Sequence, residues 1–499
     1  MDQTETIAFL ETDLGQRSRA RIDTHISTVL MAGDRVFKLK RAVKLPYADF
    51  ATPELRLAAC REEWRLNARV AAGLYVGVRR ITRAEAGGLE YDGPGPLVDA
   101  VIEMRRFHQR DLFSRLADDG RLTTELARLT AGRIARFHLS LPAEAKVGGA
   151  ESLAHAMSIN RRMLTGCNLF PRARIADLLE RLDRRFAEVA PILDARAKAG
   201  FVRRGHGDLH LANICLFDGA PTLFDCLDFS EKLAATDVLY DLAFFLMDLW
   251  RHGLRRQANA AFNRYVDETG DIEHLGLLPF LMAVRAVVRA HVLAAQAGPT
   301  DPVKERDAQS YFALAQFLLE PGAPRLLAIG GLSGTGKSTL AAQLADRIGA
   351  PPGARILSTD RIRKSLFGVP ASTRLPAEAY NPDVSVRVYE TQRSLAEHVL
   401  SGGHSAIADG VFLKEAERTA ILQTAMRTGA RFNGLWLHAP SSVLVERVER
   451  RTGSASDATA DVVALQQSAA PANPEWPSIN ARQQQPEIQR QALKALGEA

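Results

Sequence analysis

The sequence contains little cysteine, only four among 499 residues. Cys60, Cys167, Cys215 and Cys226 show neither the spacing of zinc ligands nor that of a redox-active pair. Their arrangement therefore excludes the usual cysteine-based metal and redox motifs. We expect reduced thiols in a cytoplasmic protein.

A long uninterrupted hydrophobic run is also lacking. The longest apolar region, residues 275–295, is interrupted by Arg285, Arg289 and His291. These polar groups favour a buried helix over a membrane span. Residues 1–5 are polar and acidic, unlike a signal peptide. We therefore expect no membrane partner.

No basic block is dense enough to indicate nucleic-acid binding. The formal net charge is +6, but the arginines are scattered among acidic residues, which is typical of a solvated surface. Stable nucleic-acid binding is thus not indicated, although an oligonucleotide remains among the candidate substrates. The composition, 46% hydrophobic and 24% charged, is that of a folded soluble protein.

The length, 499 residues, predicts about three domains, and no internal repeat is evident. A breaker cluster at residues 320–324 is the best linker candidate. It separates a domain over 1–320 from a domain over 325–499. We expect the first to have two lobes, divided near residue 105. From about residue 466 the chain is rich in Gln, Pro and Ala, which predicts a polar and partly disordered tail.

Sequence periodicity predicts a strand-rich start and a helical continuation. Two strands at 27–31 and 35–40 flank Ala-Gly-Asp, a hairpin signal. Short strands and loops are predicted over 202–229. Helices are predicted over 52–72, 122–139, 175–199 and most of 235–319.

Residues 331–338 fit the phosphate-binding pattern G-x-x-x-x-G-K-[ST], between an apolar strand and a helical segment. Glycines let successive N–H groups face phosphate oxygens, and the helix N-terminus adds positive charge. Lys337 would reach the β- and γ-phosphates of ATP, and the Ser338 hydroxyl would ligate Mg²⁺. The residues expected to contact the nucleotide are Gly331, Ser333, Gly334, Thr335, Gly336, Lys337, Ser338 and Thr339.

A second constellation lies at residues 206–213, His-Gly-Asp-Leu-His-Leu-Ala-Asn. Asp208 and Asn213 have the spacing of a kinase catalytic loop, in which Asp accepts the hydroxyl proton and Asn holds Mg²⁺. A predicted hairpin over 214–224 would bring Asn213 beside Asp225, as two ligands of one cation. For Asp228, a cap or turn role is as favoured as a metal role.

Residues 202–248 resemble the aminoglycoside phosphotransferase and choline kinase-like family, which shares the protein-kinase fold. The resemblance covers roughly residues 20–318. It implies that Asp208 is the catalytic base and that Asn213 and Asp225 hold Mg²⁺. Asp237 and Asp241 resemble the acidic helix of the family and would brace the catalytic loop.

The resemblance also implies a strand lysine on the phosphates, held by a helix glutamate. Lys38 or Lys40 would be the lysine and Glu62 or Glu63 its partner, and we favour Lys38 with Glu63. Two features depart from the family pattern. No G-x-G-x-x-G lies between the first strands, and the Gly after the metal Asp is replaced by Cys226.

The C-terminal part resembles AAA-type P-loop kinases, which include zeta-toxin-like and polynucleotide-kinase-like enzymes. Asp360, at the end of the second strand, would orient an attacking hydroxyl, and the adjacent Arg and Lys residues would hold an anionic substrate. Asp409 ends a later strand, as a Walker B carboxylate does, or it is an ordinary cap. Arg447 and Arg451 lie four residues apart on a basic helix and would serve as lid arginines, or that face is merely solvated.

The joint arrangement resembles bacterial proteins described as bifunctional aminoglycoside phosphotransferase/ATP-binding proteins. The expected fold is α/β and α+β: a two-lobed protein-kinase-like domain followed by a parallel-sheet P-loop kinase domain. The expected function is ATP- and Mg²⁺-dependent phosphate transfer to a hydroxyl of a small molecule or nucleotide. The alternative is an ATP-binding regulatory protein whose first domain is a weak or inactive ligand sensor.

Overall fold

The computed structural model describes residues 3–15, 20–24, 26–45, 48–228, 231–297, 301–320, 322–450, 456–470 and 474–497. Its internal contacts divide the chain into two compact units. The first comprises Met1–His252 with Val284–Phe312, and the second comprises Gly253–Ala283 with Ala313–Ala499. The two units therefore interleave along the sequence.

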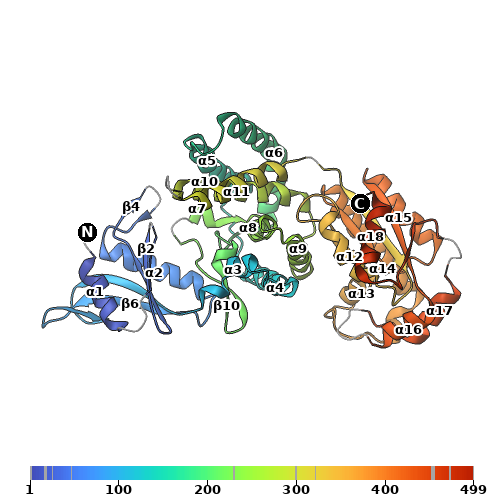
Figure 1. Ribbon diagram of the computed structural model, residues 1–499, viewed down its shortest axis with the longest axis horizontal. Coiled ribbons are helices and arrows are strands. Elements are labelled where there is room, and N and C mark those ends of the chain that lie inside the picture. Colours follow the sequence, from blue (N-terminus) through green and yellow to red (C-terminus); the bar gives the residue numbers. More distant parts are fainter. Residues whose placement is uncertain are drawn as a thin grey trace. The chain divides into compact units, whose positions relative to one another are not determined.

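The first unit begins with an antiparallel sheet of six strands in the order β1-β2-β3-β8-β6-β7 (Figure 1). The strands are β1 (Ala20–Asp23), β2 (Ser27–Ala32), β3 (Arg35–Lys40), β6 (Tyr75–Arg83), β7 (Leu89–Tyr91) and β8 (Leu97–Arg105). A small ribbon, β4 (Lys44–Leu45) with β5 (Ala48–Asp49), lies outside it. The hairpin predicted from Ala-Gly-Asp is confirmed, with Ala32 opposite Arg35 and Gly33 at φ 59° in the turn.

Helices α1 (Thr4–Asp13) and α2 (Pro53–Asn67) cover opposite faces of this sheet. Because strand side chains alternate, Phe37 packs with Leu10 of α1, whereas Val36 belongs to the core under α2. Helix α2 is shorter than the predicted helix over 52–72. It ends at Asn67, and the chain then turns through Gly73, at φ 86°, into β6.

The rest of the first unit is mainly helical. Its helices are α3 (Phe113–Asp118), α4 (Thr124–Ser140), α5 (Gly149–Thr165), α6 (Arg172–Lys198), α7 (Glu231–Ala234) and α8 (Val238–Arg251). Its short strands are β9 (Val202–Arg204), β10 (Ile214–Phe217), β11 (Ala220–Leu223) and β12 (Ala235–Asp237). The helices predicted near α4 and α6 are confirmed. Residues Val238 to Trp250 of α8 are all buried, so this helix forms the centre of the helical part.

Helices α10 (Leu278–Gln296) and α11 (Pro302–Leu318) each contribute to both units. Within the described residues, one helical segment, Leu275–Gln296, is long and apolar enough by length and composition to cross a membrane. Most of it is buried inside the protein, in agreement with the buried helix predicted from the sequence. Its Arg285 donates hydrogen bonds to the carbonyls of Tyr240 and Gly207.

The second unit contains a parallel sheet of five strands in the order β14-β15-β13-β16-β17. The strands are β13 (Arg325–Gly331), β14 (Arg355–Ser358), β15 (Ala406–Asp409), β16 (Arg431–His438) and β17 (Ser478–Asn480). The helices are α9 (Arg255–Thr269), α12 (Lys337–Leu344), α13 (Thr359–Leu366), α14 (Pro382–Ser401), α15 (Glu415–Arg427), α16 (Ser441–Glu449), α17 (Ala460–Ser468) and α18 (Gln485–Leu496). Helices α12 and α18 pack together against the face that carries Leu327 and Ile329, and α14 and α15 pack against the sheet as a second pair (Figure 1). The expected fold class is thus confirmed.

The prediction of a polar, partly disordered tail from residue 466 is wrong for most of that segment. Strand β17 extends the sheet beside β16, and α18 closes its core. Ile488, Ala492 and Leu496 recur every four residues and are buried on one helical face. The surrounding glutamines conceal this short amphipathic pattern in the composition.

Ile488→Ala tests the structural role of α18. The side chain is 1% exposed in the core of the second unit, and its loss should lower the free energy of unfolding by about 2 to 5 kcal/mol. Urea unfolding of the full chain measures this change. Lys494→Ala, on the exposed side of the same helix, is the matched control and should cost less than about 0.5 kcal/mol. Equal, small effects of both variants would contradict the packing of α18.

Candidate active sites

The loop between β9 and β10 carries the first set of predicted site residues. The β10–β11 hairpin pairs Ile214 with Leu223, and the Phe224 N–H donates to the Asn213 carbonyl at 3.0 Å. Asp225 therefore directly follows Phe224, the residue whose backbone N–H bonds to Asn213. The hairpin argument from the sequence therefore describes the local backbone correctly.

Asp208 and Asn213 are in direct contact. The Asn213 amide nitrogen donates to Asp208 Oδ2 at 2.8 Å and to the Asp208 carbonyl at 2.9 Å. The amide oxygen of Asn213 is thereby left for another partner. Although burial opposes ionisation, the neighbouring His210 and Arg289 hold the pKa of Asp208 well below its ordinary value. The carboxylate is therefore ionised at neutral pH, and its oxygens act as hydrogen-bond acceptors.

Asp225 has an unusual backbone conformation. Its φ of 64° lies in the left-handed region, which is uncommon for a residue other than glycine and occurs often at functional sites. One carboxylate oxygen, Oδ1, accepts from Lys38 Nζ at 2.5 Å, and the side chain is 44% exposed. With the amide oxygen of Asn213, it offers the hard oxygen donors that Mg²⁺ prefers. The residues present thus fit the cation.

A buried chain of ion pairs lies behind Asp225. Glu63 bridges both candidate lysines, with Lys38 Nζ 2.7 Å from Oε1 and Lys40 Nζ 2.7 Å from Oε2. Lys40 also contacts Asp228 at 2.6 Å. Burial acts against ionisation of Glu63, but the two lysines lower its pKa to about 2. Burial raises the pKa of Asp228, the end member of the chain.

The favoured pairing of Lys38 with Glu63 is present, and Lys40 shares the same carboxylate. Both lysines share Glu63, whereas Glu62 pairs with Arg65 and Arg204. Their contact with nucleotide stays a prediction. A partner role for Asp228 was not among the alternatives, because its distance in sequence from Lys40 hides the contact.

Helix α2 holds the Asp225 segment by a second contact. Asn67 is fully buried, and its side-chain oxygen accepts from the Cys226 N–H at 3.0 Å. Its amide nitrogen donates to the Glu63 carbonyl, one turn earlier, at 2.9 Å. Cys226, which replaces the Gly of the family pattern, is accommodated as a buried thiol whose pKa is raised by that burial.

Two buried carboxylates of α8 brace the loop between β9 and β10. Asp241 accepts from the N–H groups of His206 at 2.7 Å and Gly207 at 2.9 Å. Asp248 accepts from the Leu211 N–H at 2.9 Å. The family resemblance predicts a bracing role for Asp241, whereas no such role is predicted for Asp248. The sequence does contain a signal for Asp248. It lies seven residues after Asp241 on an otherwise apolar helix, which places both acids on one helical face.

Asp237 has a different position from Asp241. It caps α8 by accepting from the Leu239 N–H at 2.8 Å, and it forms a buried bidentate pair with Arg196 of α6. The pair joins the two helices away from the catalytic loop. Asp237 therefore supports the helix that carries Asp241 and does not contact the loop itself through these bonds.

The turn between β1 and β2 is tight. The Thr24 hydroxyl donates to the Ser27 carbonyl at 3.0 Å and accepts from the Ser27 N–H at 2.9 Å. Where a glycine-rich nucleotide loop would be expected, the Thr24 side chain therefore holds the backbone in a tight turn. His25, in the same turn, lies outside the described residues.

In the second unit, residues 331–338 join β13 to α12. Gly331, Gly334 and Gly336 have φ values of 135°, 87° and 89°, which side chains rarely allow. A Cβ at Gly331 would lie 2.3 Å from the Leu437 carbonyl oxygen. The glycines are therefore required for the compact cradle that the phosphate-binding pattern predicts. Lys337 begins α12 and donates to the Leu332 carbonyl at 3.1 Å.

Ser338 and Asp409 meet at the end of the sheet. The Ser338 hydroxyl donates to Asp409 Oδ2 at 2.6 Å. Burial raises the pKa of Asp409, although Lys337 and this hydrogen bond oppose the shift. Gln392 fixes the strand ends by donating to the carbonyls of Leu357 and Asp409. A hydroxyl beside a buried carboxylate fits a Mg²⁺ ion at the phosphates.

Asp360 lies in the first turn of α13, two residues beyond the end of β14. Its basic neighbours are engaged by protein groups in this structure, and their contact with an anionic substrate stays a prediction. Arg361 pairs with Asp267, Arg363 donates to the Ala379 carbonyl, and Lys364 is buried against Asp457.

Of the two predicted lid arginines, the structure describes only Arg447. Arg447 lies half-buried on α16 and forms no ion pair within the described part of the chain. Arg451 lies outside the described residues. Near this helix, the Gln466 side-chain oxygen accepts from the Ser333 N–H of the phosphate loop at 2.8 Å. Gln466, which the sequence analysis missed, thus occupies a donor that a nucleotide phosphate would use.

Comparisons with known proteins agree with the two-unit organisation. The profile of the phosphotransferase enzyme family matches residues 41–275, and that of an AAA domain matches residues 326–472. An uncharacterised protein of Mycobacterium tuberculosis is 30% identical over 461 residues, which is 89% of this chain and 88% of the relative. A Mycobacterium bovis protein matches to the same extent.

Two solved structures are similar to parts of the chain at low identity. A choline/ethanolamine kinase family protein from Mesorhizobium loti is 14% identical, with a TM-score of 0.39, and the match covers 64% of this chain and 95% of that one. A gluconokinase from Sinorhizobium meliloti is 22% identical, with a TM-score of 0.25, and the match covers 35% of this chain and 92% of that one.

Lys40→Met tests the buried ion chain. The substitution leaves Glu63 and Asp228 without a shared cation in a buried position, so the free energy of unfolding should fall by about 3 to 5 kcal/mol. Urea unfolding of the full chain measures the loss. Lys44→Met removes an exposed lysine paired with Asp49 and should cost less than about 1 kcal/mol. A similar small cost for both would show that Lys40 does not organise the buried carboxylates.

Gln466→Ala tests the occupied phosphate loop. In the parent protein, ATP must displace Gln466 before the Ser333 N–H can bond to a phosphate. Gln466→Ala removes that competition, so ATP should bind up to about tenfold more tightly. Calorimetric titration measures the affinity. Gln467→Ala is the matched control, since that amide bonds to Ser441 instead. Weaker binding by Gln466→Ala would mean that the side chain assists the nucleotide.

Proposed function

Because the chain belongs to the family of its mycobacterial relatives and joins a phosphotransferase-family domain to an AAA domain, we propose that it is a phosphotransferase with two kinase-type active sites. Each site would use ATP and Mg²⁺ to phosphorylate a hydroxyl of a small molecule or nucleotide. We place this activity in the cytoplasm, consistent with four free cysteines. The proposal includes no membrane partner and no stable nucleic-acid complex.

The observation that carries the proposal is the contact between the phosphate loop and the buried strand carboxylate. Ser338 Oγ and Asp409 Oδ2 lie 2.6 Å apart beneath a glycine cradle that side chains would fill. This pair would hold Mg²⁺, which neutralises phosphate charge when bound. Lys337 would add positive charge at the β- and γ-phosphates.

Two further groups complete the proposed second site. Asp360, in the first turn of α13, would orient the acceptor hydroxyl toward the terminal phosphate. Arg447, together with Arg451, would supply positive charge from the lid. Arg361, Arg363 and Lys364 would hold an anionic acceptor by exchanging their present protein partners for it.

In the first unit, Asp208 would accept the proton of the acceptor hydroxyl. Its ionised state and its contact with the Asn213 amide suit a base held in one orientation. Asn213 and Asp225 would hold Mg²⁺ through side-chain oxygens. Lys38, positioned by Glu63, would contact the nucleotide phosphates.

The closed Thr24 turn favours a second candidate for the first unit. A tight turn offers fewer free N–H groups to phosphate than a glycine-rich loop does. Under this alternative, the first unit senses a ligand and the P-loop unit alone turns over ATP. The two candidates share the same buried ion chain and differ only in catalysis.

Transfer of radiolabelled phosphate from ATP to a panel of metabolites and oligonucleotides tests both candidates. If both units catalyse, Asp208→Asn should lower one activity by about 10²–10⁴-fold and leave turnover at the P-loop intact. Lys337→Ala should remove the other activity. Asp218→Asn, in the exposed β10–β11 turn, is the matched control and should change neither.

The outcomes separate the two candidates. If the first unit is only a sensor, Asp208→Asn changes no rate, while Lys337→Ala abolishes all turnover. Loss of both activities with either substitution would indicate coupled units. No transfer to any acceptor, with ATP binding unaffected by Lys337→Ala, would refute the proposed phosphotransferase.

A further inference from the structure

A segment of the second unit, residues 456–470, packs against the phosphate loop, and we call it the strap. Its helix α17 lies beside α16 (Figure 1). Val463 of α17 is buried in a cluster that includes Leu332 of the phosphate loop. Near the end of the strap, the Gln466 side-chain oxygen accepts from the Ser333 N–H at 2.8 Å. The position of the strap therefore decides whether that N–H is available to a nucleotide.

Asp457 anchors the start of the strap. Its Oδ2 accepts from Lys364 Nζ at 2.5 Å, from the Tyr380 hydroxyl at 2.5 Å and from the Leu375 N–H at 3.0 Å. Although burial opposes ionisation, the hydrogen bonds from Lys364 and Tyr380 hold the pKa of Asp457 below its ordinary value. One ionised oxygen thus occupies three donors, which come from α13 and from the loop before α14.

These three donors form an anion cradle, which comprises Lys364 Nζ, the Tyr380 hydroxyl and the Leu375 N–H. Lys364 is 1% exposed, and it also donates to the carbonyl of Thr373, a neutral group. Because a buried ammonium group is costly without an opposite charge, the cradle requires an anion. Asp457 supplies that anion from within the protein, but a carboxylate or phosphate of a bound molecule offers the same kind of acceptor oxygen.

The anion cradle lies beside the groups proposed to bind the acceptor. Lys364 follows Asp360 by four residues on α13, which places both on one helical face. Strand β14, which leads into this helix, pairs Ser358 with Asp409 at the end of the sheet. Burial raises the pKa of both Tyr380 and Asp409, and the charge of Asp360 adds to each shift. An anionic group in the cradle would therefore lie close to a hydroxyl oriented by Asp360.

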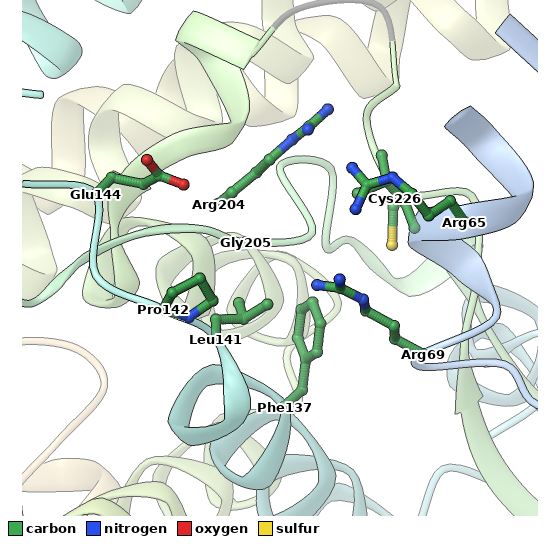
Figure 2. Close-up of a pocket in the computed structure, with 10 residues that line it drawn as sticks. Arg65, Arg69, Phe137, Leu141, Pro142, Glu144, Arg204, Gly205 and Cys226 are labelled. Atoms are coloured by element: carbon green, nitrogen blue, oxygen red, sulfur yellow. The ribbon is translucent and has the colours of Figure 1, made fainter. Parts of the chain in front are cut away.

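The distance in sequence between Asp457 and Lys364 distinguishes this ion pair from those inside one element. Arg65, which lines a cavity of about 170 Å³ in the first unit with Arg69 and Arg204 (Figure 2), pairs with Glu62 of its own helix at 2.7 Å. Asp457 lies 93 residues after Lys364. This pair therefore fixes the position of a separate segment, the strap.

We propose that the anion cradle binds an anionic group of the acceptor, a carboxylate or a phosphate, and that Asp457 occupies the cradle until such an acceptor displaces it. The inference rests on the proposed function, because that function makes the ligand a phosphate acceptor. It adds an internal competitor for the acceptor, carried by the strap.

Displacement of Asp457 has a consequence for the phosphate loop. Once the start of the strap is free, Gln466 leaves the Ser333 N–H more readily, and that donor becomes available to ATP. The anionic acceptor and ATP therefore bind with positive coupling, and each tightens the binding of the other by the same factor. The coupling cannot exceed the gain from removing Gln466, since it acts through that hydrogen bond.

Binding of a non-hydrolysable ATP analogue to the full chain tests the displacement. Hydrogen exchange in peptides that cover residues 331–340 reports the phosphate loop alone, and half-maximal protection gives the affinity there. Glycerate, glycerol 3-phosphate and glycerol share a carbon skeleton with free hydroxyls but differ in their anionic group, and each is added at matched ionic strength. An anion that enters the cradle should tighten analogue binding several-fold, up to about tenfold, whereas glycerol should not.

The two anions distinguish the possible ligands. Tightening by glycerate alone identifies a carboxylate as the group bound, and tightening by glycerol 3-phosphate alone identifies a phosphate. Unchanged or weaker analogue binding with both anions would overturn the proposal.

Variants of the anchor test the coupling without any added anion. Asp457→Asn removes the charge but keeps an acceptor oxygen, and it should tighten analogue binding by no more than Gln466→Ala does. Tyr380→Phe alters no charge and should act in the same direction with a smaller effect. In the Gln466→Ala background, both substitutions should have no further effect. Asp461→Asn, at an exposed acid in the first turn of α17, is the matched control and should bind like the parent.

The remaining outcomes separate this proposal from the proposed function. If Asp457→Asn tightens analogue binding equally in the Gln466→Ala background, the effect is one of general charge and the coupling is refuted. If the anions tighten binding but no compound of the acceptor panel is phosphorylated, the anion cradle stands and the phosphotransferase fails. If the second unit phosphorylates only neutral acceptors and Asp457→Asn leaves the affinity unchanged, the phosphotransferase stands and the anion cradle fails.

Discussion

Glu63 is the constraint on which the first unit depends. Its two carboxylate oxygens contact Lys38 and Lys40, and these lysines contact Asp225 and Asp228. Three acids and two lysines alternate in a partly buried chain, and each charge is tolerated only while its neighbour stays in place. The sheet, helix α2 and the Asp225 segment therefore cannot shift independently. That coupling holds the predicted metal ligand close to the predicted phosphate-binding lysine.

The second unit stabilises its buried carboxylate, Asp409, with fewer charged groups. Asp409 is buried at a strand end, and burial raises its pKa, while the hydroxyls of Ser338 and Ser358 and the nearby Lys337 oppose that shift. Such a carboxylate gains from a cation more than a fully paired one does. By contrast, Asp225 already has a lysine partner. A cation at Asp225 would therefore share that carboxylate with Lys38, whereas one at Asp409 would replace hydrogen bonds from neutral hydroxyls.

Local spacing predicted the parts of both sites that depend on short-range geometry. The Ala-Gly-Asp turn set the register of β2 and β3, and the phosphate loop followed directly from its glycines. Contacts between distant segments could not be derived in this way. The pairing of Lys40 with Asp228 and the contact of Gln466 with Ser333 join residues far apart in sequence. No periodicity or motif records such pairs.

Helix α9 shows why the interleaved units matter for function. Its Asn263 side chain accepts from the Ile356 N–H at 2.8 Å, and its Asp267 pairs with Arg355 at 2.5 Å. Both partners lie on β14, the strand that leads to Asp360. A helix encoded before the linker thus completes the edge of the parallel sheet. Cutting the chain at the linker would leave Arg355 without its carboxylate, so each active site is best compared within the intact protein.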